Sequence, residues 1–214
     1  MIIQDNIIKE YLKNVYFICG NACGGKTTLT KMLAEKHGFY LYDMDENYHR
    51  HRRMAEPAYQ PNMCYHLQDF HTQYTRPTAR QALWNIDTLA ESTHMALMDL
   101  VALSQDKKVV ADVSFSPVYT DKTVDYNHFV FLSVDKSEIR KSYFNRPEKQ
   151  GFYNYVKEQE LADTYFENIF RNLELTNRLE NRLIEKSGLY ILKRERADSR
   201  EDILAKVEKH FGLV

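Results

Sequence analysis

The fold is decided at Val15-Tyr-Phe-Ile-Cys19 and at the segment that follows it directly, Gly20-Asn-Ala-Cys-Gly-Gly-Lys-Thr27. The first five residues are an apolar, β-rich run, which predicts a short buried strand. Beyond the glycines, Leu29 and Leu33 stand at helical spacing, and Gly38 is suited to ending a helix. The sequence therefore predicts a strand, a glycine-rich loop and a helix in immediate succession.

The loop fits the pattern G-x-x-x-x-G-K-[ST] at every specified position. Glycines allow positive φ angles and bring backbone N–H groups close to phosphate oxygens, and the following helix directs its N-terminal dipole at the same anion. We expect Lys26 to reach the β- and γ-phosphates of ATP as a catalytic residue, and the Thr27 hydroxyl to ligate Mg²⁺. The predicted nucleotide-binding residues of the loop are Gly20, Asn21, Ala22, Cys23, Gly24, Gly25, Lys26, Thr27 and Thr28.

A chance match within an ordinary turn is the alternative interpretation of this loop. With ordinary glycine usage of about 7%, the bare pattern appears in roughly one random chain in a hundred of this length. Here three of the seven glycines of the chain lie in the loop, and the loop is flanked by the strand and helix that phosphate binding requires. We therefore interpret it as a phosphate-binding loop.

Further strand and helix patterns alternate along the rest of the chain. Apolar runs predict strands at 39–42, 107–111, 128–134 and 188–193. Helical patterns occupy 78–104, 135–144, 156–186 and the segment from Ser199 onward, and 46 to about 105 shows no convincing strand. This alternation predicts an α/β fold of three layers, with helices on both faces of a five-stranded parallel sheet.

Length and composition restrict the remaining possibilities. The 214 residues suit a single domain, 1–214, and 29 Lys+Arg against 30 Asp+Glu argue against a protein that binds nucleic acid. The three cysteines lack paired metal-ligand spacing, which favours reduced thiols in the cytosol. Without a signal-peptide core or an apolar run of about 18 residues, we expect a cytoplasmic protein with no membrane partner. The oligomeric state is not indicated.

The loop and its context resemble the P-loop kinases of the nucleoside-monophosphate-kinase-like group, which includes shikimate kinase, gluconate kinase, chloramphenicol phosphotransferase and adenylate kinase. The resemblance covers nearly the whole chain in element order, but only the loop is a highly specific motif. It implies a P-loop NTPase fold with strand order 2-3-1-4-5, a helical acceptor-binding insertion at 46–104 and a lid at 140–156. It also implies ATP as donor and Mg²⁺ as cofactor.

The second predicted strand ends in Tyr42-Asp43-Met44-Asp45, which looks like the shikimate kinase pattern. That likeness implies Asp43 near Mg²⁺ and Asp45 in contact with the acceptor hydroxyl, as its catalytic base. Residues at the carboxyl end of a parallel strand border the crevice where such sheets bind ligands, and a carboxylate there can accept a hydroxyl proton. The alternative is a pair of solvated acids or the cap of the next helix.

Asp112 ends the apolar run Val109-Val-Ala-Asp112, as a Walker B acid that binds Mg²⁺ would. An ordinary turn aspartate is the alternative. The chain departs here from adenylate kinase, which shows Gly and then Arg shortly after this acid. It departs as well from shikimate kinase, because the glycine cluster after this strand is absent.

Two arginines follow the fourth predicted strand at the start of the region that resembles the lid. The resemblance implies that Arg140 stacks on adenine and that Arg146 moves over the phosphates in a catalytic role. Arginine suits both tasks because its planar guanidinium stacks on rings and holds phosphate through two hydrogen bonds. Solvated arginines on a helix surface are the alternative.

The predicted insertion carries the basic run Tyr48-His-Arg-His-Arg-Arg53. Arg50 and Arg53 share a helix face and would hold an anionic acceptor, although a solvated helix face is the alternative. Together the motifs favour an ATP-dependent phosphotransferase that modifies a hydroxyl of a small molecule. The alternatives are a nucleoside or nucleotide kinase, which needs a clamp for an acceptor phosphate, and a nucleotide-binding regulatory module with little or no catalysis.

Overall fold

The computed structural model describes residues 4–65, 70–115, 122–195 and 197–214. Its centre is a sheet of five parallel strands in the order β2-β3-β1-β4-β5. The predicted α/β fold with strand order 2-3-1-4-5 is therefore confirmed, and each strand overlaps its predicted segment. The strands are β1 (Val15–Gly20), β2 (Tyr40–Asp43), β3 (Val109–Asp112), β4 (Phe129–Ser133) and β5 (Ile191–Lys193).

The register of the strands brings polar residues together at one edge of the sheet. Asp112 at the end of β3 lies opposite both Asp43 of β2 and Ile18 of β1, and Gly20 lies opposite Leu132 of β4. Parallel strands present their carboxyl ends at the same edge, which is where open α/β sheets bind ligands. The glycine-rich loop and the two aspartates therefore share this edge.

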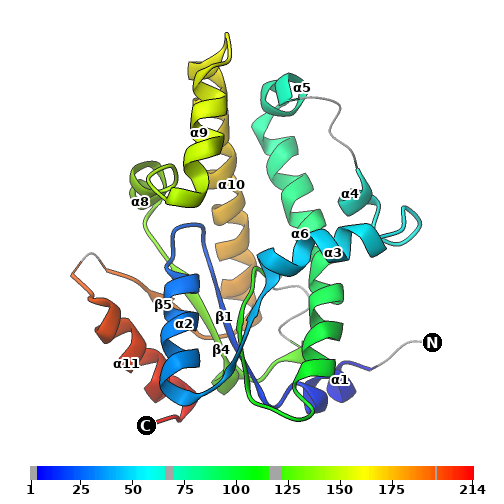
Figure 1. Cartoon of the computed structure of the whole chain (residues 1–214), viewed down its shortest axis with the longest axis vertical. Coiled ribbons are helices and arrows are strands. Elements are labelled where there is room, and N and C mark those ends of the chain that lie inside the picture. Colours follow the sequence, from blue (N-terminus) through cyan, green and yellow to red (C-terminus); the bar gives the residue numbers. More distant parts are fainter. Residues whose placement is uncertain (1–3, 66–69, 116–121, 196) are drawn as a thin grey trace.

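Helices cover both faces of the sheet and give it three layers (Figure 1). Tyr16 and Ile18 of β1 pack with α2 and α11 on one face, while Phe17 and Cys19 pack with α1, α6 and α10 on the other. This follows from the alternation of side chains along a strand. The five helices are α1 (Asp5–Tyr11), α2 (Lys26–His37), α6 (Thr78–Leu103), α10 (Ala162–Ser187) and α11 (Arg200–Phe211).

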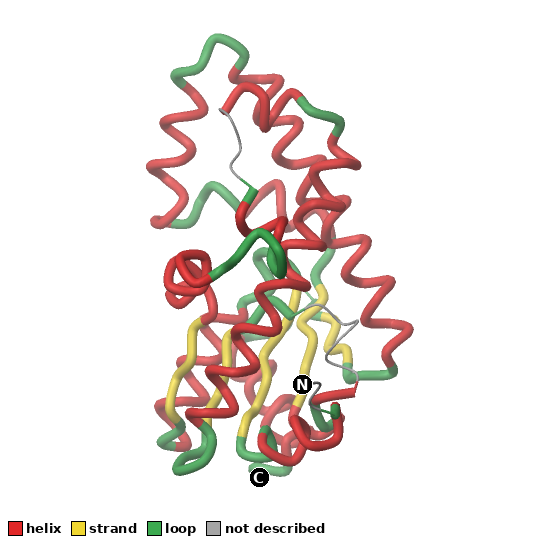
Figure 2. The backbone as a smooth tube through the Cα atoms, turned by 90° about the vertical axis from the view of Figure 1, so that its right-hand side faces the viewer, coloured by secondary structure: helices red, strands yellow, loops and turns green. Residues whose placement is uncertain are grey.

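A helical region extends beyond the carboxyl edge of the sheet (Figure 2). In residues 46–65 and 70–104, which the structure describes, all regular structure is helical. This agrees with the absence of strand patterns in the sequence of this segment. None of the described helices combines the length and the apolar character that crossing a membrane requires. The shorter helices of this region are α3 (Met44–Met54), α4 (Pro61–Cys64) and α5 (Phe70–Thr75).

The helix predicted at 156–186 is two helices, so this prediction is wrong at its start. The chain forms α9 (Gln150–Lys157), reverses through 158–161 and continues as α10. The reversal lets Val156 of α9 and Ile169 of α10 pack together with Phe144 in an aromatic cluster. Before α9, the helix α8 (Lys136–Ser142) is followed by η2 (Pro147–Lys149), which leads straight into α9.

Candidate active site

Close approach between the loop and β4 explains two of the loop glycines. Gly20 has a φ of 149°, and a Cβ atom there would lie 2.4 Å from the carbonyl oxygen of Leu132. At Gly24 a Cβ atom would lie 3.0 Å from the carbonyl oxygen of Asn21. At Gly20 any side chain would push the loop away from the strand, so glycine is a steric requirement there, whereas at Gly24 a Cβ atom would be tightly packed and would need a small shift of its neighbours.

Cys23 and Gly25 adopt left-handed backbone conformations. Gly25, the N-cap of α2, has φ 88°, and Cys23 has φ 66°, in a region that residues other than glycine rarely occupy. Strained backbone of this kind concentrates at ligand-binding sites. Because α2 begins at Lys26, the N–H groups of its first turn have no acceptor within the helix and are available to an anion.

The Lys26 side chain curls back over the loop. Its Nζ donates to the carbonyl oxygens of Gly20 at 2.9 Å and of Asn21 at 3.3 Å. This fold-back holds the ammonium charge against the loop, next to the positive end of the α2 dipole. Both charges favour an anion at the same place.

Asn21 connects the loop to two neighbouring elements. It is fully buried, its backbone N–H donates to Leu132 O at 3.0 Å, and its side-chain Nδ2 donates to Asn181 Oδ1 of α10 at 3.0 Å. The Asn21 Oδ1 accepts from the backbone N–H of Val134 at 3.4 Å. The structure therefore gives both the backbone N–H and the side chain of Asn21 a supporting position, and the phosphate contact of this residue stays a prediction.

Asp112 and Thr27 form the centre of the predicted Mg²⁺ site. The Thr27 hydroxyl hydrogen-bonds the buried Asp112 carboxylate. Burial raises the pKa of this carboxyl, Lys26 and Thr27 lower it, and the charges of Asp43 and Asp45 raise it further. A hydroxyl and a carboxylate in contact, with further carboxylates within electrostatic range, suit Mg²⁺, which uses one or two protein oxygens together with phosphate oxygens.

Asp43 is a helix cap, as the alternative interpretation of this residue proposed. Its side chain accepts hydrogen bonds from the backbone N–H groups of Asp45 at 2.9 Å and Glu46 at 3.3 Å and starts α3. Asp45 lies in the first turn of α3 with an exposed side chain. Both acids lie within electrostatic range of Asp112, but the three carboxylates do not converge: among the described residues, no group of three His, Cys, Asp or Glu side chains is placed to hold a metal ion.

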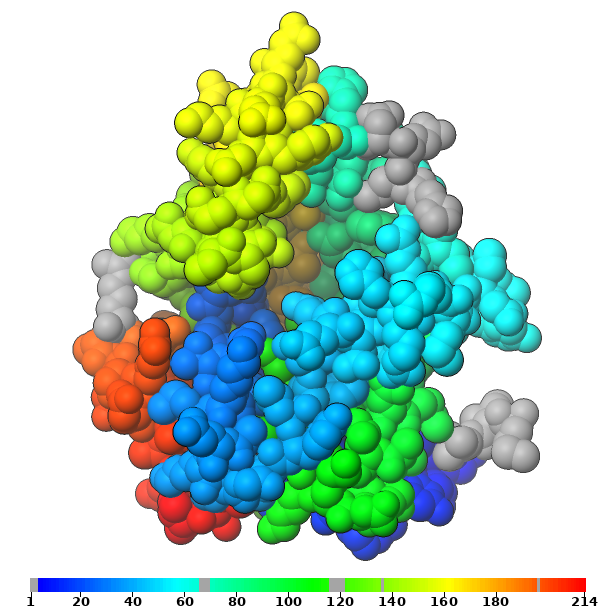
Figure 3. All heavy atoms as spheres, in the orientation of Figure 1, coloured from blue at the N-terminus to red at the C-terminus, as the bar shows by residue number. Residues whose placement is uncertain are grey.

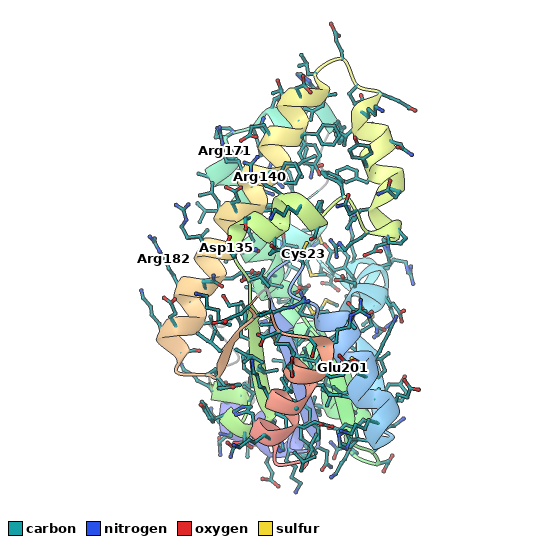
Figure 4. All side chains as sticks on the ribbon, turned by 90° about the vertical axis from the view of Figure 1, so that its left-hand side faces the viewer. Cys23, Asp135, Arg140, Arg171, Arg182 and Glu201 are labelled. Carbon is teal, nitrogen blue, oxygen red and sulfur yellow. The ribbon has the colours of Figure 1, made fainter. Side chains whose placement is uncertain are left out.

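A cavity of about 760 Å³ adjoins the loop at Cys23. Its other walls come from the start of α8, including Asp135, and from the residues after β5, including Arg194. Figure 4 shows Cys23 and Asp135 next to each other at this position. The volume is in the range of small-molecule sites, and it is ample for the base and ribose of a nucleotide whose phosphates lie on the loop.

Sequence reasoning missed Arg194. Its Nη1 lies 3.1 Å from the position that a Cβ atom at Gly25 would take, so the guanidinium covers the loop. The signal was available, because Arg194 directly follows β5 and therefore stands at the ligand-binding edge of the sheet.

The two predicted lid arginines differ in their placement. Arg146 lies within electrostatic range of the loop, because its charge is the largest influence that opposes the burial-raised pKa of the Cys23 thiol. Its guanidinium also pairs with Glu148 at 3.6 Å and lies over the Tyr143 ring. Arg140 instead donates to Glu174 at 2.6 Å and to Glu167 at 3.0 Å on α10. It is not among the described residues that line the 760 Å³ cavity. The structure therefore offers no support for its predicted stacking on adenine.

The two predicted substrate arginines also lie apart. Arg50 pairs with Asp99 of α6, which in addition accepts from Tyr42 at 3.0 Å and contacts His51 Nε2 at 2.6 Å. Arg53 lines a separate cavity of about 590 Å³ between α3 and α4. They do not form a common anion clamp, although both lie on α3 as predicted.

Glu180 of α10 is a second residue that sequence reasoning missed. Part of the residue remains accessible, but its carboxyl is enclosed, and this desolvation raises its pKa to about 7 against the lowering influence of Lys26 and of a hydrogen bond with Asn21. Glu180 therefore belongs to the site although it lies far from the loop in sequence. No sequence pattern distinguishes it, because α10 carries many other polar residues and most positions of this helix are at least partly exposed.

The molecule is hollowed beside the loop (Figure 3). The recess lies between the segment 140–156 on one side and α3 on the other, and α6 and α10 are visible at its back. A reacting molecule in the recess would have access to the loop. The cavity next to Cys23 and this recess thus provide space on two sides of the loop.

An all-parallel sheet of order 2-3-1-4-5 with flanking helices is consistent with a P-loop-like α/β fold. No family model matches the chain, and no curated protein sequence matches it. Because one fold can host many functions, the chemistry of the site has to indicate the function.

Proposed function

We propose that this protein is an ATP-dependent phosphotransferase that moves the γ-phosphoryl group of ATP to a hydroxyl of a small molecule. The observation that carries the proposal is the convergence of the Lys26 ammonium and the hydrogen-bonded pair of Thr27 and Asp112 on one glycine-rich loop. Phosphoryl transfer needs little covalent chemistry from a protein. It depends on positioning and on charge stabilisation, which these groups supply.

Each group has a distinct task in this proposal. The loop amides and Lys26 hold the phosphates, and Arg146 and Arg194 neutralise charge that develops during transfer. Thr27 and Asp112 would hold Mg²⁺, with Asp43 nearby, and a bound Mg²⁺ would supply positive charge that neutralises part of the phosphate charge. Asp45, in the first turn of α3, would accept the proton of the acceptor hydroxyl.

The placement of the arginines of α3 favours a hydroxyl compound over a nucleotide as acceptor. A nucleotide kinase needs cations that grip an acceptor phosphate. Arg50 is neutralised by Asp99, and Arg53 lines the cavity between α3 and α4. The alternative function, a nucleotide-binding regulatory module, has no acceptor. The metabolite screen described below distinguishes it from a phosphotransferase.

Calorimetric titration with MgATP tests the donor site. Lys26→Ala is expected to weaken binding by at least about 100-fold, which corresponds to roughly 2.7 kcal/mol for the loss of a charged hydrogen-bond donor. The matched control is Lys31→Ala, because Lys31 is an exposed lysine on the same helix and its loss should leave affinity unchanged. Equal affinities of both variants and wild type would refute the loop assignment.

A screen of metabolites scored by ADP release tests the transfer step. Release that increases with an acceptor and disappears in Lys26→Ala is the expected result. Slow release that no compound changes would favour the regulatory module instead.

A further inference from the structure

Polar side chains line the contact between the two longest helices, α6 and α10. They recur one and two turns apart on each helix, which places them on one helix face. Below them toward the sheet the contact is apolar, with Leu97, Leu100 and Ile184 in the core. We call this set the α6–α10 seam, and it comprises Gln81, Asn85 and Thr88 of α6 and Asn172, Thr176 and Glu180 of α10.

The hydrogen bonds within the seam are long. Gln81 Nε2 donates to Asn85 Oδ1 at 3.4 Å, and Asn85 Nδ2 donates to Asn172 Oδ1 at 3.4 Å and to Thr176 Oγ1 at 3.5 Å. Good protein hydrogen bonds of this type measure about 2.7–3.2 Å. The polar groups of the seam residues therefore form only weak hydrogen bonds with one another.

Two seam atoms are buried without any partner in the described part of the chain. They are Oε1 of Gln81, a residue that is 4% exposed, and Oγ1 of Thr88. A buried polar atom without a partner is costly, and native proteins contain few of them. Unpaired atoms beside overlong hydrogen bonds indicate a set of groups arranged for another molecule.

The seam begins at the phosphate loop. Glu180 lies within the electrostatic influence of Lys26, and Thr176 and Asn172 follow about 6 and 12 Å farther along α10, at 1.5 Å per residue. The helices that carry the seam form the back of the recess in Figure 3. A molecule held along the seam would therefore extend from the site of phosphoryl transfer.

We propose that the α6–α10 seam binds the phosphoryl acceptor and that this acceptor is an uncharged polyhydroxylated molecule. Amide and hydroxyl side chains both donate and accept, as a polyol requires. None of the six seam positions is Lys or Arg, so the seam offers no cation for a phosphorylated acceptor. This inference rests on the proposed function for its role in transfer, but the binding itself is testable without catalysis.

Thermal unfolding of the ligand-free protein separates a binding surface from a structural network. Thr88→Val keeps the shape and removes the unpartnered hydroxyl, so a binding surface predicts an unchanged or higher melting temperature. Asp87→Ala, at an exposed position of the same helix, is the control. A melting temperature that drops in Thr88→Val but not in Asp87→Ala would overturn the proposal, because the hydroxyl would then support the fold.

Saturation-transfer NMR of the full chain with MgADP tests the ligand class. The probes are glycerol, myo-inositol and glucose, with glycerol 3-phosphate and glucose 6-phosphate as charged counterparts. At least one neutral probe should bind wild type and Asp87→Ala, and Asn85→Leu should weaken that binding at least about tenfold. Binding of phosphate esters alone, binding of none of the neutral probes, or binding that survives Asn85→Leu would each overturn the inference.

The two proposals fail in different ways. If the wild-type protein does not bind MgATP, the proposed phosphotransferase function is refuted, but polyol binding at the seam can still be observed. Intact MgATP binding without polyol binding would remove only the seam.

Discussion

At the scale of single residues, Gly20 has the least room in the glycine-rich loop. A methyl group there would overlap the Leu132 carbonyl oxygen, at 2.4 Å, and the loop cannot move without losing its contacts to β4. We expect Gly20→Ala to lower the free energy of unfolding by roughly 2–4 kcal/mol, measured by urea denaturation.

The control for that measurement is Gly151→Ala in α9, where a Cβ atom would meet nothing within 4 Å. Alanine is the better helix former, so this variant should gain about 0.5–1 kcal/mol. A comparable loss in both variants would show that the close contact at Gly20 does not matter.

Glu180 gives folding stability a specific pH dependence. Its carboxyl has a pKa of about 7 in the folded protein against 4.5 in an unfolded chain, so the folded state binds more protons between these values. Stability should therefore fall as pH rises from about 4.5 to 7. Glu180→Gln should reduce this slope and increase stability at pH 8 by on the order of 2 kcal/mol, as urea titrations at pH 5 and pH 8 would measure. An unchanged slope in the variant would contradict the burial of this carboxyl.

A site residue could be predicted from the sequence where its role depends on neighbouring residues in the chain, and not where it depends on tertiary packing. The loop from Gly20 to Thr27 was predictable because its geometry depends on consecutive residues. Glu180 could not be predicted, because it lies near the loop only as a result of how α10 packs. The spacing of apolar residues predicts a helix there but does not say where the helix packs. The partners of Arg50 and Arg140 also come from distant helices, so the sequence could not distinguish a ligand contact from an internal ion pair.

At the scale of elements, α8 is attached to α10 through Arg140. The guanidinium bonds Glu167 and Glu174, but all three groups are partly exposed, so the pairs contribute little to global stability. We expect Arg140→Ala to change the free energy of unfolding by less than about 1 kcal/mol. Amide exchange should nevertheless accelerate in 136–157, because this attachment is local.

Hydrogen–deuterium exchange of wild type and Arg140→Ala measures this effect. Arg171→Ala is the control, because its contact with Glu167 is longer, at 3.9 Å, and Figure 4 shows it pointing outward from α10. Equal exchange in 136–157 for wild type and Arg140→Ala would count against the attachment.

The presence of the strands could be predicted from the sequence, whereas the break between α9 and α10 could not. The apolar runs of β1, β3 and β4 are buried on both faces, and such runs have few other stable placements. The residues 158–161 contain neither Gly nor Pro, so no local signal marks the reversal. It is imposed by tertiary packing around Phe144, which pattern reasoning does not include.

At the scale of the whole molecule, the aromatic cluster around Phe144 is separate from the cores on the two faces of the sheet. Phe144 is 8% exposed and contacts rings of α9 and α10. We expect Phe144→Ala to destabilise the helices that pack around this cluster, within 140–175, by about 3 kcal/mol or more. Exchange should rise in 140–175, while β1 and β4 keep their protection.

Mass-resolved hydrogen exchange distinguishes the possible results of Phe144→Ala. Loss of protection confined to the helical region would indicate that this region opens without the sheet. Equal loss in β1 and β4 would instead show that the two regions unfold as one unit.

The fold-back of Lys26 has a consequence for how the loop selects its ligand. In the resting protein the ammonium already bonds Gly20 O and Asn21 O, so an incoming anion must compete with the main chain for that cation. A monovalent anion would gain little from the exchange. Under the proposed function, a polyphosphate would engage several amides at once and compensate for the two broken bonds, so the loop should favour polyvalent over monovalent anions.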